Sequence, residues 1–341
     1  MTNTPPRNLI LFGIYVFVTL VVGVAALIWP SFRSVAYAPL RDFLFPNMFL
    51  PTEASAPVKL SVAVPMALES WVKARSGELM AQNQFIEIEI SQLNGREADR
   101  KLNTLTGQTD VWIAESDFAR AAAGGIPYEK QGPSVAQDTF LWVAVKAQSQ
   151  LENNLNWQSI AQTVKDNPSF MIAMPPANSI EGMAACWIAS AEYYGTETPN
   201  AAQINDAAFR NWLKALLVAA PDRNRSPRDQ LATRPPQAHA GLILQSDWSQ
   251  LAQPSFNSQP PSHNVAFNYP YYIRNAWQNL QPEEISAHED AAKRFRAFLL
   301  SASAQNALAT EGLQAANAQP TGQQLPVMDE SMIRALQFCW Q

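Results

Sequence analysis

The chain has 341 residues, of which 47% are hydrophobic and 16% are charged, and its formal net charge is −5. This apolar content is typical of a globular protein and excludes a largely disordered chain. The acidic balance and the lack of a long basic run exclude a nucleic-acid-binding protein, which would be expected to carry a basic patch.

An uncharged hydrophobic segment, residues 9–29, follows a short N-terminal tail of residues 1–8. At 1.5 Å per residue this segment is long enough to cross a hydrocarbon core of about 30 Å, so we expect one transmembrane helix that anchors the chain. A cleaved signal peptide stays open as the alternative, because residues 24–26 (Val-Ala-Ala) form a tolerable cleavage site. Basic residues flank the segment on both sides and therefore do not decide its orientation.

Residues 30–56 contain several prolines among bulky apolar side chains and are predicted to form a juxtamembrane linker. From residue 57 onward, short β-branched or apolar runs alternate with runs of helical periodicity, which is typical of an α/β fold with a parallel sheet covered by helices. The predicted strands are 58–64, 85–90, 110–114, 140–146, 170–174, 241–244 and 265–267. The predicted helices are 67–82, 95–105, 117–123, 157–165, 179–194, 201–219, 295–300, 304–310 and 332–338, and residues 221–236 and 253–261 are predicted surface loops.

The two cysteines, Cys186 and Cys339, form neither a disulfide framework nor a metal-binding motif. We expect two buried free thiols, unless the C-terminal segment packs onto the middle of the chain and allows a bridge. The three histidines are far apart and match no metal-ligand spacing, so no metal and no cofactor is expected.

Catalytic and nucleotide-binding signatures are absent from the sequence. There is no glycine-rich phosphate loop, no G-x-S-x-G and no H-E-x-x-H. Ser70 and Lys73 match S-x-x-K, but the companion motifs of that enzyme class are missing, and a helix surface is the simpler interpretation. The sequence therefore indicates a protein that is not an enzyme.

Candidate ligand-binding residues lie where the predicted strands end, because ligands of open α/β sheets bind beyond the carboxyl ends of the strands. Asn178 or Ser179 can also cap the helix that follows, whose free N–H groups suit an anion or a polar ligand; a simple helix cap is the alternative. The candidates, to which two tyrosines near the last predicted strand are added, are Pro65, Met66, Glu115, Ser116, Asn178, Ser179, Tyr269 and Tyr271.

Several stretches resemble the type 2 periplasmic solute-binding proteins. DVWIAESDFAR (110–120) is similar to the third strand and loop of that family, and FLWVAVK (140–146) to its first crossing strand. FMIAMPPANSIEGMAACWIAS (170–190) resembles the opening of the second lobe, with Ser179 and Gly182 in S-x-x-G positions. AGLILQSDW (240–248) resembles the strand before the return crossing, and residues 295–317 resemble the helix pair near the C-terminus, which is the most specific match.

The resemblance implies a two-lobed "Venus flytrap" fold that closes on a ligand between its lobes. Residues 57–139 and 275–341, including a C-terminal helix, would form lobe 1, and residues 140–274 would form lobe 2. The resemblance also implies that the lobes lie on the extracytoplasmic side of a cell membrane. A branch of the family with this general appearance occurs beside von Willebrand factor A-like domains.

Two functions are compatible with these observations. The first is a membrane-tethered solute-binding protein that binds a small polar or anionic ligand for an ABC-type importer and meets a membrane permease. The second is a sensor or assembly module that uses the same fold to act through a protein partner. The sequence fixes neither the ligand nor the choice between them.

Overall fold

The computed structural model describes residues 57–341, except 94, 99–100, 103–108, 149–150, 152–153, 252, 278–279, 320–321, 326–327 and 341. The predicted transmembrane helix (9–29) and linker (30–56) lie outside the described residues. None of the helices within the described part of the chain has the length and hydropathy needed to cross a bilayer.

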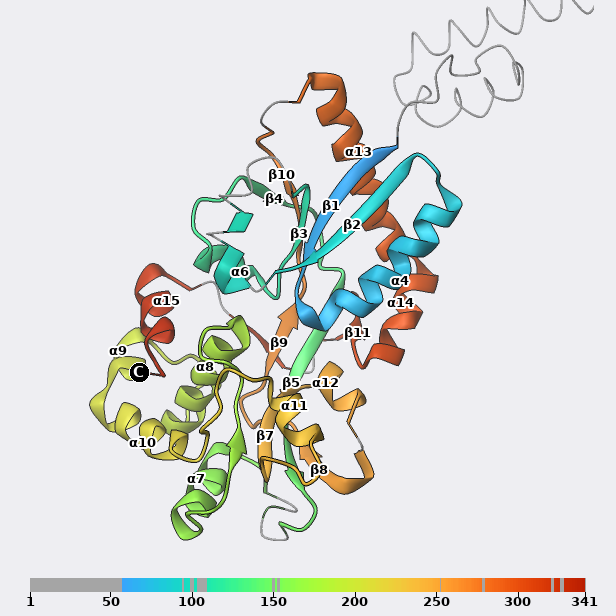
Figure 1. The fold of residues 1–341 in the computed structure, drawn as a ribbon. Helices are drawn as coiled ribbons and strands as arrows, with labels where there is room; N and C mark the ends of the chain where they lie inside the picture. Colours follow the sequence, from blue (N-terminus) through green and yellow to red (C-terminus); the bar gives the residue numbers. More distant parts are fainter. Residues whose placement is uncertain are drawn as a thin grey trace, which may run out of the picture. The chain divides into compact units, whose positions relative to one another are not determined.

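The first lobe contains a five-stranded sheet in the order β2-β1-β3-β10-β4 (Figure 1). The strands are β1 (Val58–Val64), β2 (Ile86–Gln92), β3 (Val111–Ile113), β4 (Tyr128–Lys130) and β10 (Tyr271–Arg274). β1 pairs in parallel with β2 and β3, whereas β10 runs antiparallel to β3 and β4. The lobe also contains α4 (Met66–Gln82), α6 (Asp117–Ala122), α13 (Pro282–Leu299), α14 (Ala302–Ala307), η1 (Gly95–Glu97) and η4 (Leu308–Glu311).

The second lobe is built on a seven-stranded sheet whose main order is β12-β9-β5-β7-β6. The strands are β5 (Ala136–Val145), β6 (Ile172–Ala173), β7 (Ala240–Leu244), β8 (Phe256–Gln259), β9 (Val265–Asn268), β11 (Gln314–Ala315) and β12 (Gln323–Gln324); β8 and β11 also pair with β5. The accompanying helices are α7 (Trp157–Asp166), α8 (Ile180–Tyr194), α9 (Ala201–Asn205), α10 (Ala207–Leu217), α11 (Pro227–Ala232), α12 (Gln245–Ser249), α15 (Glu330–Gln337) and η3 (Gln253–Ser255).

The chain passes between the two sheets along β5 and along the β9–β10 segment (Figure 1). The N–H of Val135 donates to the carbonyl of Tyr269 at 2.9 Å, and the N–H of Tyr269 donates to the carbonyl of Ala136 at 3.0 Å. These paired crossing segments are the place where a hinge between the lobes would bend. Because β10 belongs to the first sheet, the return crossing precedes residue 271, earlier than the predicted boundary at 274.

α8 is the central helix of the second lobe. Its residues are apolar on nearly every face, and twelve of the fifteen are buried. The helix is therefore held by packing on several sides and does not have one apolar face and one polar face. The helix begins at Ser179, whose Oγ accepts a hydrogen bond from the N–H of Gly182 at 2.9 Å. It ends at Gly195 in the left-handed region (φ +62°), which glycine adopts without steric cost.

The C-terminal segment is fastened to the second lobe. α15 packs against α8 and α9, so the predicted grouping of residues 275–341 with the first lobe does not hold for this helix. A disulfide joins Cys186 of α8 to Cys339, with Cα atoms 6.5 Å apart. The expectation of free thiols is therefore wrong, because the C-terminal segment does pack onto the middle of the chain.

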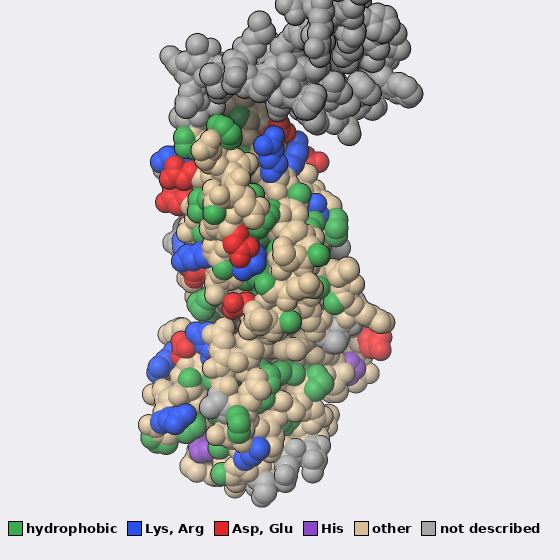
Figure 2. All heavy atoms as spheres, turned by 90° about the vertical axis from the view of Figure 1, so that its right-hand side faces the viewer, with side chains coloured by type: hydrophobic (Ala, Val, Ile, Leu, Met, Phe, Trp, Pro, Cys, Tyr) green, Lys and Arg blue, Asp and Glu red, His purple; other side chains and the backbone are tan. Residues whose placement is uncertain are grey.

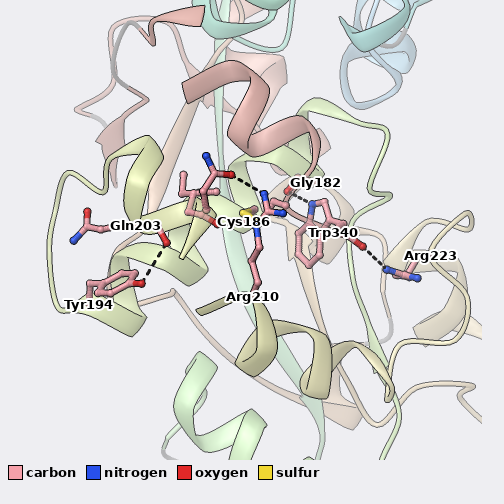
Figure 3. Close-up of a disulfide and its surroundings, with 10 residues drawn as sticks. Gly182, Cys186, Tyr194, Gln203, Arg210, Arg223 and Trp340 are labelled. Atoms are coloured by element: carbon pink, nitrogen blue, oxygen red, sulfur yellow. Dashed lines mark hydrogen bonds between the residues drawn. A yellow bond between two sulfur atoms is a disulfide. The ribbon is translucent and has the colours of Figure 1, made fainter. Parts of the chain in front are cut away.

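Two hydrogen bonds reinforce the attachment beside the disulfide (Figure 3). The indole Nε1 of Trp340 donates to the carbonyl of Gly182 at 3.0 Å, and the guanidinium of Arg223 donates to the carbonyl of Trp340 at 3.2 Å. The first turn of α8 is thereby linked directly to the end of the described chain.

Some predicted elements differ from those observed. The predicted helix 201–219 is two helices, because Asp206 has extended backbone (ψ 132°) and caps α10. The predicted loop 221–236 contains α11, and the predicted loop 253–261 contains β8. α13 begins at Pro282 rather than at residue 295, and β4, β10 and α12 were not predicted.

Candidate functional site

A cavity of about 180 Å³ lies between the two lobes. The first lobe contributes the start of α4, the end of β2 and the loop after β3. The second lobe contributes the β6–α8 loop, α11, β7 and α12. The lining residues are Met66, Ala67, Gln92, Leu93, Glu115, Phe140, Pro175, Pro176, Ser179, Glu181, Ser226, Pro227, Arg228, Leu242, Ile243, Leu244, Ser246, Asp247 and Gln250.

The structure places some of the residues that were predicted to bind a ligand at the cavity and others away from it. Met66, Glu115 and Ser179 line the cavity. Pro65 is adjacent as the residue before α4, and Ser116 caps α6 by accepting from the N–H of Ala119 at 3.2 Å.

The remaining three candidates do not line the cavity. Asn178 is exposed. Tyr269 is buried between the crossing segments, and Tyr271 donates its hydroxyl hydrogen to the carbonyl of Ala292 in α13 at 2.8 Å. Tyr271 therefore serves the core of the first lobe.

Ser179 and Gly182 shape the wall formed by the second lobe. Ser179 Oγ accepts from the N–H of Gly182 and donates to the carbonyl of Pro176 at 2.8 Å. A Cβ atom on Gly182 would stand 2.1 Å from the same carbonyl oxygen. The S-x-x-G pattern thus closes a tight turn between β6 and α8 and uses the hydroxyl of Ser179 for the turn.

Glu115 lies in the loop that follows β3, and its side chain is buried. Its Oε1 accepts a hydrogen bond from the N–H of Gly95 at 2.7 Å, whereas its Oε2 has no hydrogen-bond partner among the described residues. Burial, and secondly the charge of Glu181, raises the pKa of Glu115 to about 8. An unpaired buried carboxyl group at a cavity wall is typical of a functional site rather than of a stable core.

Two more carboxyl groups reach the cavity from the second lobe. Glu181 lies in the first turn of α8, and burial raises its pKa. Asp247 lies in α12; burial raises its pKa to about 6, although Arg228 acts in the opposite direction. Nη1 of Arg228 is 3.5 Å from Oδ1 of Asp247 and donates to Oε1 of Gln250 at 2.7 Å.

A fourth carboxyl group, Asp138 on β5, lies behind the lining. Its Oδ2 accepts from the hydroxyl of Ser246 at 2.6 Å, and its Oδ1 accepts from the N–H of Thr139 at 2.8 Å. Burial raises the pKa of Asp138 to about 7. Both oxygens of Asp138 thus have hydrogen-bond partners. The bond to Ser246 holds the start of α12 against the crossing strand β5.

The sequence analysis overlooked Glu181, Asp247 and Arg228. Each lies within a helix, where a charged residue ordinarily faces water, and nothing in the local pattern shows that the other lobe covers it. Glu115 was found because it directly follows a strand. Outside the cavity, on the face shown in Figure 2, the described basic and acidic side chains are interspersed rather than gathered by sign.

No protein-family model and no curated protein sequence matches the chain. Solved structures do match it. A protein assigned to a spermidine/putrescine ABC transporter of Listeria monocytogenes is 11% identical, with a TM-score of 0.61 and coverage of 83% of this chain and 98% of that chain. The ferric binding protein of Campylobacter jejuni is 13% identical, with a TM-score of 0.57 and coverage of 82% and 96%.

The sulfate-binding protein SubI of Mycobacterium tuberculosis H37Rv is 14% identical, with a TM-score of 0.54 and coverage of 79% and 93%. The names of these three proteins refer to solute binding or transport. Identities this low show the fold alone. The chain therefore has the two-lobed α/β fold of the type 2 periplasmic solute-binding proteins of ABC transporters.

Proposed function

We propose that the protein is a solute-binding protein that holds a small ligand between its lobes and presents it to an ABC-type importer. The observation that carries this proposal is the cavity, whose lining comes from both lobes and contains one buried polar atom without a described partner, Oε2 of Glu115. Ligands of α/β sheets bind at the carboxyl ends of the strands, where Glu115 and the β6–α8 loop lie. The likeness to solute-binding proteins of ABC transporters supports the same function.

A thermal-shift screen of the purified chain against small solutes tests this function. The screen contains amines, amino acids, sugars, oxyanions and metal ions at millimolar concentration. A ligand that binds the native state alone raises the midpoint by mass action, so at least one class should stabilise the protein. A chain that responds to no solute at millimolar concentration would contradict the proposed function.

The proposal includes an extracytoplasmic location and a membrane tether. The hydrophobic segment 9–29 in the sequence supports the tether. The disulfide between Cys186 and Cys339 supports the location, because disulfides persist in oxidising compartments. Mass spectrometry of the mature N-terminus, together with alkaline extraction of membranes, tests both; a mature chain that begins after residue 26 and is released by extraction would contradict the tether.

The second candidate function is a sensor or assembly module. The observation that favours it is again the segment 9–29, because a retained helix would confine the lobes to partners in the same membrane. A membrane protein that co-purifies with the chain, combined with no response in the solute screen, would favour this function over transport.

A further inference from the structure

We infer that the cavity between the lobes binds a short aliphatic ammonium ion, which is held by the unpaired carboxyl oxygen of Glu115 on the first lobe and by the carboxyl groups of Glu181 and Asp247 on the second lobe. The inference rests on the proposed function and names the ligand class for the same site.

The ionisable side chains that line the cavity are mostly acidic. Three described lining residues carry carboxyl groups, and Arg228 is the only described lining residue that carries a positive charge. The guanidinium of Arg228 is already engaged with Asp247, Asp229 and Gln250. An incoming anion would therefore meet carboxyl groups rather than a free cation, whereas an ammonium ion would be attracted.

The unpaired oxygen of Glu115 is the observation that turns an acidic cluster into a site. The side chain is only 2% exposed and lines the cavity, and Oε2 has no hydrogen-bond partner among the described residues. A buried polar atom without a partner is unfavourable. Because burial raises the pKa of Glu115 to about 8, an ammonium ion displaces the proton of this carboxyl group to solvent, and an N–H of the ligand then satisfies the free oxygen. An ammonium group has three such donors and a full positive charge.

The N-terminus of α8, which was expected to suit an anion or a polar ligand or to be a simple helix cap, is already supplied with acceptors. Ser179 Oγ accepts from the N–H of Gly182, and Glu181 places a carboxyl group in the first turn. Negative charge near a helix N-terminus is favourable, so the protein's own carboxylate takes the role that an external anion would have. The expectation of an anionic ligand is therefore not supported by this geometry.

Much of the rest of the lining is apolar, beside the polar residues Gln92, Ser226, Ser246 and Gln250. Leu93, Phe140, Leu242 and Leu244 contribute buried apolar surface, and Met66 at the start of α4 is 62% exposed. The apolar part of the lining suits the body of a short aliphatic chain.

The position of the carboxyl groups couples binding to closure. Glu115 belongs to one lobe, and Glu181 and Asp247 belong to the other, so their mutual repulsion opposes approach of the lobes when they are ionised. A cation between them interacts with both lobes at once and favours the closed arrangement, as a population shift requires.

The inference is tested by calorimetric titration of the full chain, in detergent, with three compounds of equal length. Butane-1,4-diamine is the cation, butane-1,4-diol is the neutral analogue and butanedioate is the anion; magnesium chloride is the metal-ion control. The expected result is binding of the diamine, with no detectable heat from the diol, the dianion or magnesium.

Glu115→Gln retains the acceptor for the N–H of Gly95 and removes the charge, so it should weaken the diamine by at least about tenfold. Glu181→Gln serves as a second variant on the opposite lobe, with the same expected direction. Glu289→Gln is the matched control, because Glu289 pairs with Lys293 on the surface of α13, away from the cavity lining. It should leave the affinity unchanged.

The outcomes separate this inference from the proposed function. Tighter binding of butanedioate or of the diol, heat from magnesium without heat from the diamine, or unchanged diamine affinity in Glu115→Gln, overturns the ammonium inference. If a different solute from the thermal-shift screen binds while the amines do not, the inference fails and the solute-binding function stands. If no solute binds, both fail.

Discussion

The two oxygens of Glu115 have different environments, and this difference is the residue-scale basis of the site. Oε1 is held by the N–H of Gly95, which fixes the carboxyl group, and Oε2 stays unpaired at the cavity. A buried carboxyl group with a purely structural role would be expected to have hydrogen-bond partners for both of its oxygens. The arrangement holds a carboxyl group in place at the cavity at the cost of stability in the empty protein.

That cost predicts a pH dependence of stability. Burial, then Glu181, raises the pKa of Glu115 from 4.5 to about 8. Between these values the folded protein keeps a proton that the unfolded chain has released, so the free energy of unfolding falls as the pH rises. Glu115 alone contributes a slope of at most about 1.4 kcal/mol per pH unit, and Glu115→Gln should remove it.

Urea denaturation of both proteins between pH 5 and pH 8 measures this difference. Glu181, Asp247, Asp138 and Arg228 remain in both proteins, so the difference between the two curves reports Glu115 together with its interaction with Glu181. Parallel curves would show that Glu115 does not keep its proton in the folded state.

Ser179 makes a second residue-scale prediction. Its hydroxyl caps α8 and closes the turn at Pro176, so Ser179→Ala should lower the free energy of unfolding by about 1 kcal/mol. Ser301→Ala is the control outside the cavity. It removes a comparable cap from α14, because the Oγ of Ser301 accepts a hydrogen bond from the N–H of Ala304 at 3.4 Å. Only Ser179→Ala should also weaken the ligand; equal ligand affinity in the two variants would show that the β6–α8 turn does not contribute to binding.

At the scale of elements, the turn between β6 and α8 depends on the missing side chain of Gly182. A Cβ atom there would stand 2.1 Å from the carbonyl oxygen of Pro176, which is backbone and cannot easily move. Gly182→Ala should therefore destabilise the fold by about 1–3 kcal/mol. Chemical denaturation measures the change.

Gly77→Ala in α4 is the matched control for Gly182→Ala. No atom lies within 4 Å of the position of its Cβ, so alanine should stabilise the exposed helix by about 0.5–1 kcal/mol. Changes of the same sign in both variants would contradict the explanation by close approach of the backbone.

The disulfide makes the second prediction at this scale. It joins residues 153 positions apart and holds the segment after α15 on α8. It therefore strongly reduces the conformational freedom of the unfolded chain. Its removal should lower the free energy of unfolding by about 2–5 kcal/mol. Denaturation with and without a reducing agent measures this loss, and a variant with both cysteines replaced by alanine should be insensitive to the reducing agent. An unchanged midpoint on reduction would contradict the attachment.

The sequence predicted those elements whose local pattern is strong. β1, α4 and α8 combine apolar runs with clear ends, and their predicted bounds agree with the structure to within a residue. β10 and β8 were not predicted because they become strands by pairing with β3, β4 and β5, and their own composition does not indicate a strand. The disulfide depended on α15 packing on α8 and α9, which no local pattern reveals.

The candidate site was predictable in part for the same reason. Residues that follow strands, such as Glu115 and Ser179, could be named because strand ends converge in an α/β sheet. Glu181 and Asp247 could not, because their role arises only when the second lobe faces the first.

At the scale of the whole molecule, the two lobes, their two crossing segments and the cavity between them are the parts that the proposed solute-binding function requires. The resemblance in the sequence predicted the two-lobed fold, and the solved structures confirm that fold. The membrane anchor, the location and the likeness to domains beside von Willebrand factor A-like proteins remain predictions.

Hydrogen–deuterium exchange of the full chain, with and without the solute that stabilises it best, tests the central claim most directly. A ligand between the lobes should slow exchange on both sides of the cavity together, in residues 92–93 and 115–117 of the first lobe and in residues 179–183 and 244–247 of the second. Slowed exchange confined to one lobe, or found instead at the surface groove between α7 and α10, would contradict the account.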